Sequence, residues 1–130
     1  GTTADHIARA ALESMCGQSC ELLVALKIDA GVDLSDVKVD GGASVNNHLM
    51  QFQADLLNAV IRRPVVPETT ALGAAFLAGL AVNFWQDTAE LTQRWKLDQQ
   101  FTPNMPEQRR EAYSRQWQRA IERATGWIQP

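Results

Sequence analysis

The sequence predicts a helix-rich α/β domain built around one parallel βαβ unit. Most of the chain has the apolar spacing of amphipathic helices, and two short β-branched runs, residues 37–40 and 60–63, flank a helical segment over residues 45–58. A connection of this length, with a helix in it, typically joins parallel strands. Two strands make a marginal sheet, so we expect the unit to belong to a larger one. The chain shows no convincing third strand.

Length and composition are those of one globular domain. The chain has 130 residues, of which 45% are hydrophobic and 21% charged, and its net charge at pH 7 is −3. Nucleic acid is not expected as a partner, because phosphate binding needs clustered cations. The most apolar stretch, residues 71–82, is shorter than the roughly twenty residues that cross a bilayer. We therefore expect a soluble protein with no membrane partner, and its two cysteines, expected to be reduced, indicate the cytoplasm.

The first helix is expected over residues 3–28. Thr2 or Thr3 can cap it, Asp5 is placed to complete a capping box, and Gly31 marks its end. Its apolar stripe predicts one buried face. The stripe consists of Ile7, Ala8, Ala11, Leu12, Met15, Leu22, Leu23 and Leu26.

Three more helices are expected in the second half, over residues 70–82, 87–95 and 106–125. Thr69 or Thr70 can cap the first, and its alanines and glycines indicate tight packing on a sheet. The segment before the last helix is irregular, with at most a little strand near Leu97. Asp87 can cap the helix over residues 87–95, and Pro106 suits the first turn of the last helix. The inward face of the last helix is expected to consist of Tyr113, Trp117, Ala120, Ile121 and Ala124. Its solvated face is expected to carry Arg109, Arg110, Arg115, Arg119 and Arg123.

The two cysteines are expected to be reduced thiols. Cys16 and Cys20 lie four residues apart on one helix face, where helix geometry does not favour a disulfide. Together with His6 or His48 they match no standard metal-ligand spacing, so we expect no metal site.

The segment that carries chemistry is Asp40-Gly41-Gly42-Ala43-Ser44-Val45-Asn46-Asn47. Glycines between a strand and a helix let the backbone approach a ligand, and the free amides of the following helix favour an anion such as phosphate. Asn46 has both a donor and an acceptor available to read a base or a ribose. The pattern is neither the Walker A motif nor G-x-G-x-x-G, and a plain tight turn is the competing interpretation. No acid–base pair stands near it, so we name no catalytic residue.

The run from Val39 to Trp85, VDGGASVNNHLMQFQADLLNAVIRRPVVPETTALGAAFLAGLAVNFW, closely resembles the C-terminal domain of the FGGY family of carbohydrate kinases, most of all its glycerol kinase branch. The run HIARAALE, starting at His6, resembles the second half of a family signature. This resemblance implies an actin-like, ribonuclease-H-like fold, with two such domains closing over a cleft. Residues 1–130 would form the C-terminal part of the ATP-side domain. The N-terminal domain, which holds glycerol, and the first strands of this domain would lie outside the chain.

The resemblance also implies site residues and an activity. Gly42 matches the glycine whose backbone lies at the nucleotide phosphates, and Asn46 matches the asparagine near the adenosine end. Asp40, Gly41 and Ala43 would be supporting residues of the turn. The implied reaction transfers the γ-phosphoryl group of ATP, bound as its Mg²⁺ complex, to glycerol and gives glycerol 3-phosphate.

The catalytic aspartate of the family would lie outside the chain, so we expect the fragment alone to be inactive. The alternatives are another FGGY sugar or polyol kinase, or a non-catalytic interaction module that keeps the fold. Exposed sheet edges and bare apolar helix faces also favour self-association, so we expect a homo-oligomer.

Overall fold

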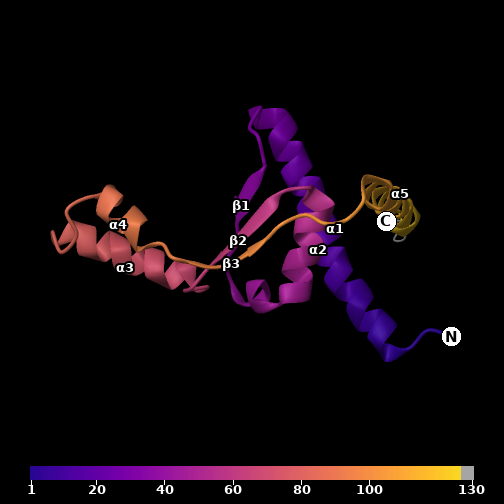
Figure 1. Cartoon of the computed structure of the whole chain (residues 1–130), viewed down its shortest axis with the longest axis horizontal. Coiled ribbons are helices and arrows are strands. Elements are labelled where there is room, and N and C mark those ends of the chain that lie inside the picture. The colour runs from indigo at the N-terminus through magenta and orange to yellow at the C-terminus, as the bar shows by residue number, and fades with distance from the viewer. Residues whose placement is uncertain (127–130) are drawn as a thin grey trace.

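The computed structural model describes residues 1–126, in which the first two α-helices lie beside a small sheet and the next two project away from it. Every helix predicted from the sequence is present, with ends shifted by a few residues (Figure 1). The elements in order are α1 (Ala4–Ala30), β1 (Asp36–Lys38), the 3-10 turn η1 (Gly42–Val45), α2 (Asn47–Leu57), β2 (Val60–Pro64), α3 (Thr69–Ala81), α4 (Thr88–Arg94), β3 (Leu97–Phe101) and α5 (Glu107–Ala124).

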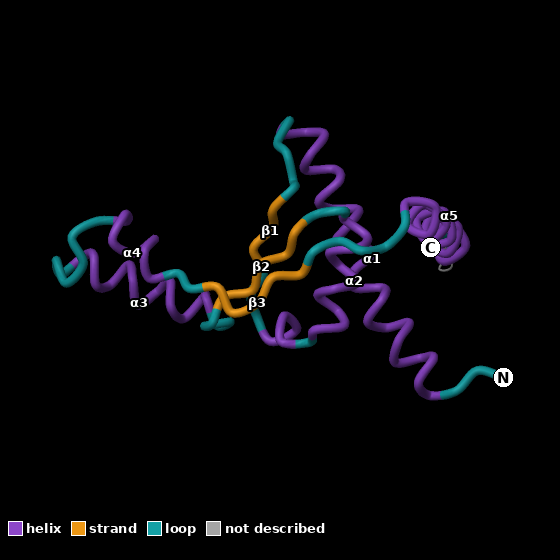
Figure 2. Tube along the Cα trace, viewed as in Figure 1, coloured by secondary structure: helices purple, strands orange, loops and turns teal. Residues whose placement is uncertain are grey.

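The sheet has three strands in the order β1-β2-β3 (Figure 2). β1 and β2 pair in parallel, with Val37 opposite Ile61, so the predicted βαβ unit is confirmed. β3 pairs with β2 in antiparallel fashion, with Phe101 opposite Ile61. The expectation of no convincing third strand was wrong. The sequence of β3, LDQQF, has no β-branched residue, and the strand forms because it satisfies the second edge of β2 and buries Phe101.

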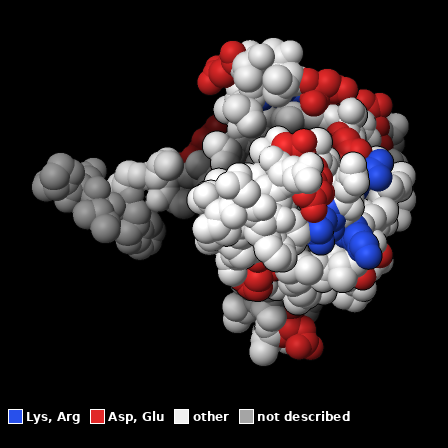
Figure 3. Space-filling view, turned by 90° about the vertical axis from the view of Figure 1, so that its left-hand side faces the viewer, with Lys and Arg blue, Asp and Glu red and all other residues white. Residues whose placement is uncertain are grey.

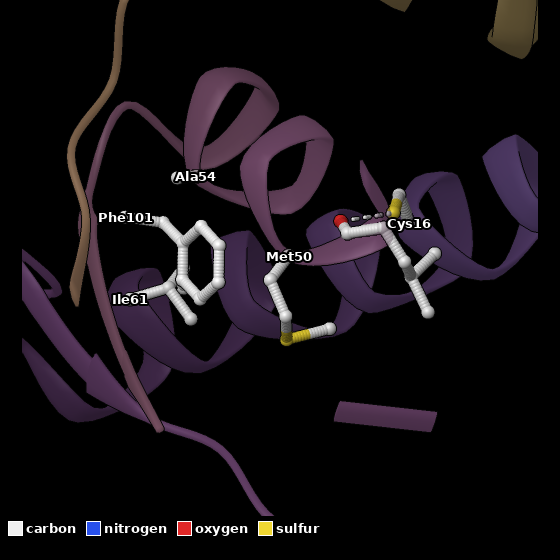
Figure 4. Packing of buried hydrophobic residues seen from close by; sticks show 6 residues of the cluster. Cys16, Met50, Ala54, Ile61 and Phe101 are labelled. Atoms are coloured by element: carbon white, nitrogen blue, oxygen red, sulfur yellow. Dashed lines mark hydrogen bonds between the residues drawn. The ribbon is translucent and has the colours of Figure 1, made fainter. Parts of the chain in front are cut away.

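The hydrophobic core lies where α1 and α2 meet the sheet. Its buried members are Cys16, Leu49, Met50, Ala54, Ile61 and Phe101 (Figure 4). Ile61 is fully buried at the centre of the sheet, and the Cys16 thiol donates a 3.6 Å hydrogen bond to the Leu49 carbonyl. The core therefore joins the first helix to the βαβ unit.

The helix ends follow local hydrogen bonding, with three corrections. At α1 the partner of Thr3 is His6 and not Asp5: the Thr3 amide donates to His6 Nδ1 at 3.1 Å. α2 begins at Asn47, two residues later than predicted, because the preceding residues form η1. The N-cap of α3 is Glu68, which makes no side-chain cap bond, and not Thr69 or Thr70; the Thr69 hydroxyl donates to Asp40.

Two other predicted ends are correct. Gly31, with φ of 63°, ends α1 in the left-handed conformation that favours glycine. Asp87 caps α4 by accepting a 2.9 Å hydrogen bond from the Glu90 amide.

The predicted packing of α3 on a sheet is wrong, because this helix has no buried residue. Together with α4 it extends away from the strands (Figure 1), and its uncharged sequence contributes to a broad uncharged surface on this side of the molecule (Figure 3). The Trp85 indole packs on Gly79 and makes edge-on contacts to Phe76 and Phe84. The Arg94 guanidinium lies 4.0 Å from the centre of the Trp85 ring. The glycine at position 79 of α3 therefore makes room for Trp85, in the turn that follows the helix, and not for a strand of the sheet.

The buried residues of α1 are Cys16 and Gly17, which lie outside the predicted apolar stripe; of that stripe only Leu12 and Leu23 are half-buried, so the expected buried face is wrong for most of its length. Ile7 and Leu22 are 65% and 70% exposed. A Cβ at Gly17 would lie 2.7 Å from the Trp117 ring, which explains a glycine in mid-helix at this crossing with α5.

The inward face predicted for α5 is only partly buried. Tyr113, Trp117 and Ile121 are half-buried, whereas the two alanines of the predicted stripe are exposed. The Tyr113 hydroxyl donates to the Glu13 carbonyl at 3.1 Å, which ties α5 to α1. Within residues 1–126, no helix combines the length and the apolar character needed to cross a membrane.

Candidate functional site

The glycine turn leaves β1 and leads into α2, and the segment before α3 holds it. Gly41 has φ of 79°, so this position requires a left-handed conformation. The Gly41 amide donates a 2.7 Å hydrogen bond to the Pro67 carbonyl, and the Asp40 carboxylate accepts from the Thr69 hydroxyl. Asp40 is thus engaged with α3 and does not cap the turn itself.

Gly42 is a different kind of glycine. It is exposed, its φ lies outside the left-handed region, and a Cβ built on it would meet nothing within 4 Å. Within residues 1–126 the amides of Gly42 and Ala43 donate to no protein acceptor. The turn therefore offers unpaired donors next to open space, as an anion site at a helix start requires.

Ser44 anchors η1 from inside. It is 2% exposed, and its hydroxyl donates to the Gly41 carbonyl at 2.7 Å. The Ser44 amide donates to the same carbonyl at 3.0 Å. The buried end of the turn is therefore rigidly bonded while its outer end, at Gly42 and Ala43, is open.

Asn46 is the N-cap of α2. Its Oδ1 accepts a 3.1 Å hydrogen bond from the Leu49 amide, so the expectation that donor and acceptor are both free was wrong. The side-chain NH₂ donates to no acceptor in the part of the chain that the structure describes. Asn46 therefore has its NH₂ donors available for an acceptor atom of a ligand, while Oδ1 is already engaged in the cap.

Arg63 is a site-forming residue that the sequence reasoning missed. Its Nη1 donates to the Ser44 carbonyl at 2.8 Å and to Asn47 Oδ1 at 2.9 Å, directly beneath the turn. A signal existed, because Arg63 is two residues from Ile61 and so shares its inward face in a strand. A charged residue at an inward position of a short strand indicates a specific polar partner.

An apolar groove of about 510 Å³ begins beside the turn, where Asp40, Ala43 and Ser44 line one end of it. The remaining lining is mostly apolar and comes from α1, α2 and the first two strands. Gly42 and Asn46 lie outside this lining. The groove suits a hydrophobic occupant, whereas the donors at the turn suit a phosphate.

No metal centre can be assembled from this chain as described. Within residues 1–126, no three His, Cys, Asp or Glu side chains lie close enough to hold an ion together. His6 and His48 are exposed, and Cys16 and Cys20 are free thiols.

The cysteines are held in the protonated form by burial. Burial raises the pKa of Cys16 from 9.0 to about 12, with smaller contributions from Cys20 and Glu13. Burial likewise raises the pKa of Cys20 to about 11 and that of the Tyr113 hydroxyl from 10.0 to about 12. None of these groups is a nucleophile at neutral pH.

These shifts predict a loss of stability at alkaline pH. Below about pH 9 the folded and unfolded chains hold the same thiol protons. As the pH rises from about 9 towards 12, the unfolded chain loses protons that the folded chain keeps, so unfolding becomes easier. Urea unfolding of the chain at pH 7.5, 9 and 10.5 measures the decline, and it should be weaker in a Cys16→Ala/Cys20→Ala variant. A midpoint that does not fall by pH 10.5 contradicts the prediction.

Sequence comparison identifies the family. The model for "FGGY family of carbohydrate kinases, C-terminal domain" matches residues 1–82. The chain is 59% identical over 127 residues to a glycerol kinase of Dechloromonas aromatica, covering 98% of this chain and 25% of the relative. It is 53% identical over 130 residues to a glycerol kinase of Trichlorobacter lovleyi, covering 100% of this chain and 26% of the relative. The chain thus spans about a quarter of the length of these relatives.

Solved structures share the fold. A crystal structure of Plasmodium falciparum glycerol kinase with ADP superposes with a TM-score of 0.78 at 34% identity, covering all of this chain and 26% of that one. A crystal structure of a gluconate kinase from Lactobacillus acidophilus superposes with a TM-score of 0.67 at 22% identity, and the match covers 95% of this chain and 25% of the gluconate kinase chain. At this identity the match supports only the shared fold. The helix-rich α/β fold, part of the actin-like, ribonuclease-H-like architecture, is as the sequence resemblance implied. The chain belongs to the FGGY family of carbohydrate kinases.

Proposed function

We propose that this chain is the ATP-side part of a glycerol kinase, which transfers the γ-phosphoryl group of ATP to glycerol and gives glycerol 3-phosphate. The observation that carries the proposal is the open turn at Gly42, with unpaired amides at the start of η1 and no structural demand for glycine at that position. The 59% identity to a glycerol kinase supports glycerol over other polyols as the acceptor.

Each residue of the turn has a distinct proposed role. The Gly42 and Ala43 amides donate to phosphate oxygens, which can approach closely because Gly42 has no side chain. The Asn46 NH₂ donates to an acceptor at the adenosine end while its Oδ1 caps α2. Gly41 holds the turn through its bond to Pro67, before α3, and Asp40 through its bond to Thr69, the first residue of α3.

The remaining chemistry is assigned to parts of the kinase outside these residues. Phosphoryl transfer requires the attacking hydroxyl, the phosphate and Mg²⁺ to be aligned, with the spread charge of the transition state stabilised. Within the described residues, the carboxylate of the turn, Asp40, is engaged with Thr69. As the family resemblance implies, we place the catalytic aspartate and the glycerol contacts outside this chain, and we assign residues 1–130 to the C-terminal, ATP-side domain.

Self-association of the isolated chain and a cytoplasmic location stay predictions. Large apolar side chains such as Ile7, Leu22, Ile28 and Leu77 are 65% to 75% exposed, which favours self-association of this piece.

A chimeric kinase tests the proposed function. The segment of the Dechloromonas aromatica glycerol kinase that aligns with this chain is replaced by residues 1–130, and ATP-dependent formation of glycerol 3-phosphate is measured. We expect the chimera to be active, because the two segments are 59% identical, and the isolated chain to give no turnover. A folded chimera without activity, or turnover by the isolated chain, contradicts the proposal.

An Asn46→Asp variant of the chimera tests the proposed role of Asn46 in nucleotide binding. Aspartate keeps an oxygen that caps α2, but it replaces the NH₂ donors with a second carboxylate oxygen and adds a negative charge. We expect KM for ATP to rise about tenfold or more, because a hydrogen bond is lost and the new carboxylate repels the anionic nucleotide, with KM for glycerol unchanged. An unchanged KM for ATP would remove Asn46 from the site.

A further inference from the structure

Arg63 is a buried cation with a complete set of partners. Its side chain, on β2, is only 10% exposed. Its Nε donates to Asp98 Oδ2 at 2.8 Å, its Nη2 lies 2.7 Å from the same oxygen, and Nη2 also donates to Gln99 Oε1 at 3.0 Å. The guanidinium carbon lies 5.5 Å from the centre of the Phe101 ring. β3 therefore fixes the plane of the guanidinium from one side.

The remaining nitrogen of the guanidinium, Nη1, bonds to the glycine turn and to the start of α2. Nη1 donates to the Ser44 carbonyl and to Asn47 Oδ1, at positions on either side of Asn46. Ser44 in turn donates through its hydroxyl to the Gly41 carbonyl. A continuous path of hydrogen bonds thus runs from Asp98 on β3, through Arg63, to the turn.

We propose that Arg63 is a positioning residue for nucleotide binding: it holds the Gly41–Asn46 turn in the conformation that presents the turn amides and the Asn46 NH₂ to ATP. The inference rests on the proposed function. Arg63 acts through Ser44 and Asn47, and Asp98 orients it.

Geometry, and not charge alone, is the contribution of this arginine. The planar guanidinium reaches four acceptors in fixed directions, two on each side. A lysine carries the same charge as a compact ammonium and cannot bridge the two sides in the same way. Arg63→Lys should therefore restore the charge without restoring the position of the turn.

The test uses the chimeric kinase and a matched pair of variants. Arg63→Met removes the bridge. Arg62→Met makes the same change one residue earlier, where Arg62 pairs at 2.7 Å with Asp36 on β1 and makes no bond to the turn. We expect Arg63→Met to raise KM for ATP about tenfold or more, as expected for losing charge-assisted hydrogen bonds, with KM for glycerol within about twofold of the parent. Arg62→Met should leave both constants unchanged, and Arg63→Lys should behave like Arg63→Met.

A second variant keeps the test decisive if Arg63→Met does not fold. Asn47 is exposed, and Asn47→Ala removes only one of the acceptors of the guanidinium. We expect it to raise KM for ATP about threefold to tenfold without changing KM for glycerol.

The outcomes separate this inference from the proposed function. If Asn46→Asp raises KM for ATP but Asn47→Ala and any folded Arg63 variant do not, the positioning role is overturned and the site stands. Equal changes in both KM values, or rescue by Arg63→Lys, likewise overturn it. If the chimera is inactive or Asn46→Asp has no effect, the proposed function itself fails.

Discussion

Gly42→Leu is expected to lower kcat/KM for ATP of the chimeric kinase by about 100-fold or more, the loss that follows when reacting groups are displaced by roughly an ångström. Within residues 1–126 no atom lies within 4 Å of a Cβ built on Gly42, and the residue is exposed, so we expect the protein to accommodate a leucine in this space. In the proposed complex that space belongs to the nucleotide, and the side chain pushes the phosphates off the turn amides. Steady-state kinetics with ATP varied at saturating glycerol measures the effect.

The same openness predicts that folding is spared. Since no atom lies within 4 Å of the added Cβ and no left-handed φ is required, the melting temperature of Gly42→Leu should equal that of the parent. Gly42→Ala should show a smaller kinetic defect in the same direction. Gln108→Leu, an exposed position at the start of α5, adds the same side chain to the surface as a control and should change neither property. A Gly42→Leu enzyme with parental kcat/KM for ATP would show that the nucleotide does not lie against this turn.

Ile61→Ala is expected to destabilise the chain by about 2–5 kcal/mol, the range for truncating a buried aliphatic side chain. Ile61 is 0% exposed, lies on the central strand and pairs with residues of both neighbouring strands. Truncation to alanine leaves a cavity at this position. Among the described residues the buried hydrophobic cluster has six members, so few side chains can move to fill that cavity. Because single domains are stable by only about 5–15 kcal/mol, this loss is a large share of the total.

Ile28→Ala is the matched control, because the same atoms are removed from a side chain that is 75% exposed on α1. Its effect should stay within about 0.5 kcal/mol. Urea unfolding of both variants of the 130-residue chain, followed by circular dichroism, gives the two differences. Equal losses in the two variants would show that the sheet centre is not the core of the folded chain.

Local patterns in the sequence were sufficient for most elements. The apolar periodicity of α1 and α2, the β-branched runs of β1 and β2, and stop signals such as Gly31 depend on residues close in the chain. The parallel pairing of β1 with β2 followed from the length of the connection. The glycine turn was found the same way, because the strand exit, the glycines and the helix start are contiguous.

What was missed depends on residues far apart in the chain. β3 has weak strand propensity, and it forms because β2 has a free edge and Ile61 needs the cover of Phe101. The inward position of Arg63 indicates a polar partner, but the partners themselves are 16 to 36 residues away in the chain and so cannot be named from the local sequence. The acceptor of Asn46 looked free in sequence, and only the cap geometry shows that Leu49 uses it.

By itself the sequence determined the class of fold, the helices, the parallel pair and the position of the glycine turn, because short-range sterics and hydrophobic spacing decide these features. The tertiary structure alone decided which apolar faces are buried, that β3 pairs with the second edge of β2, and that Arg63 connects β3 to the turn. A buried charge is tolerated only where several distant acceptors converge on it, and that convergence exists only once the chain has folded.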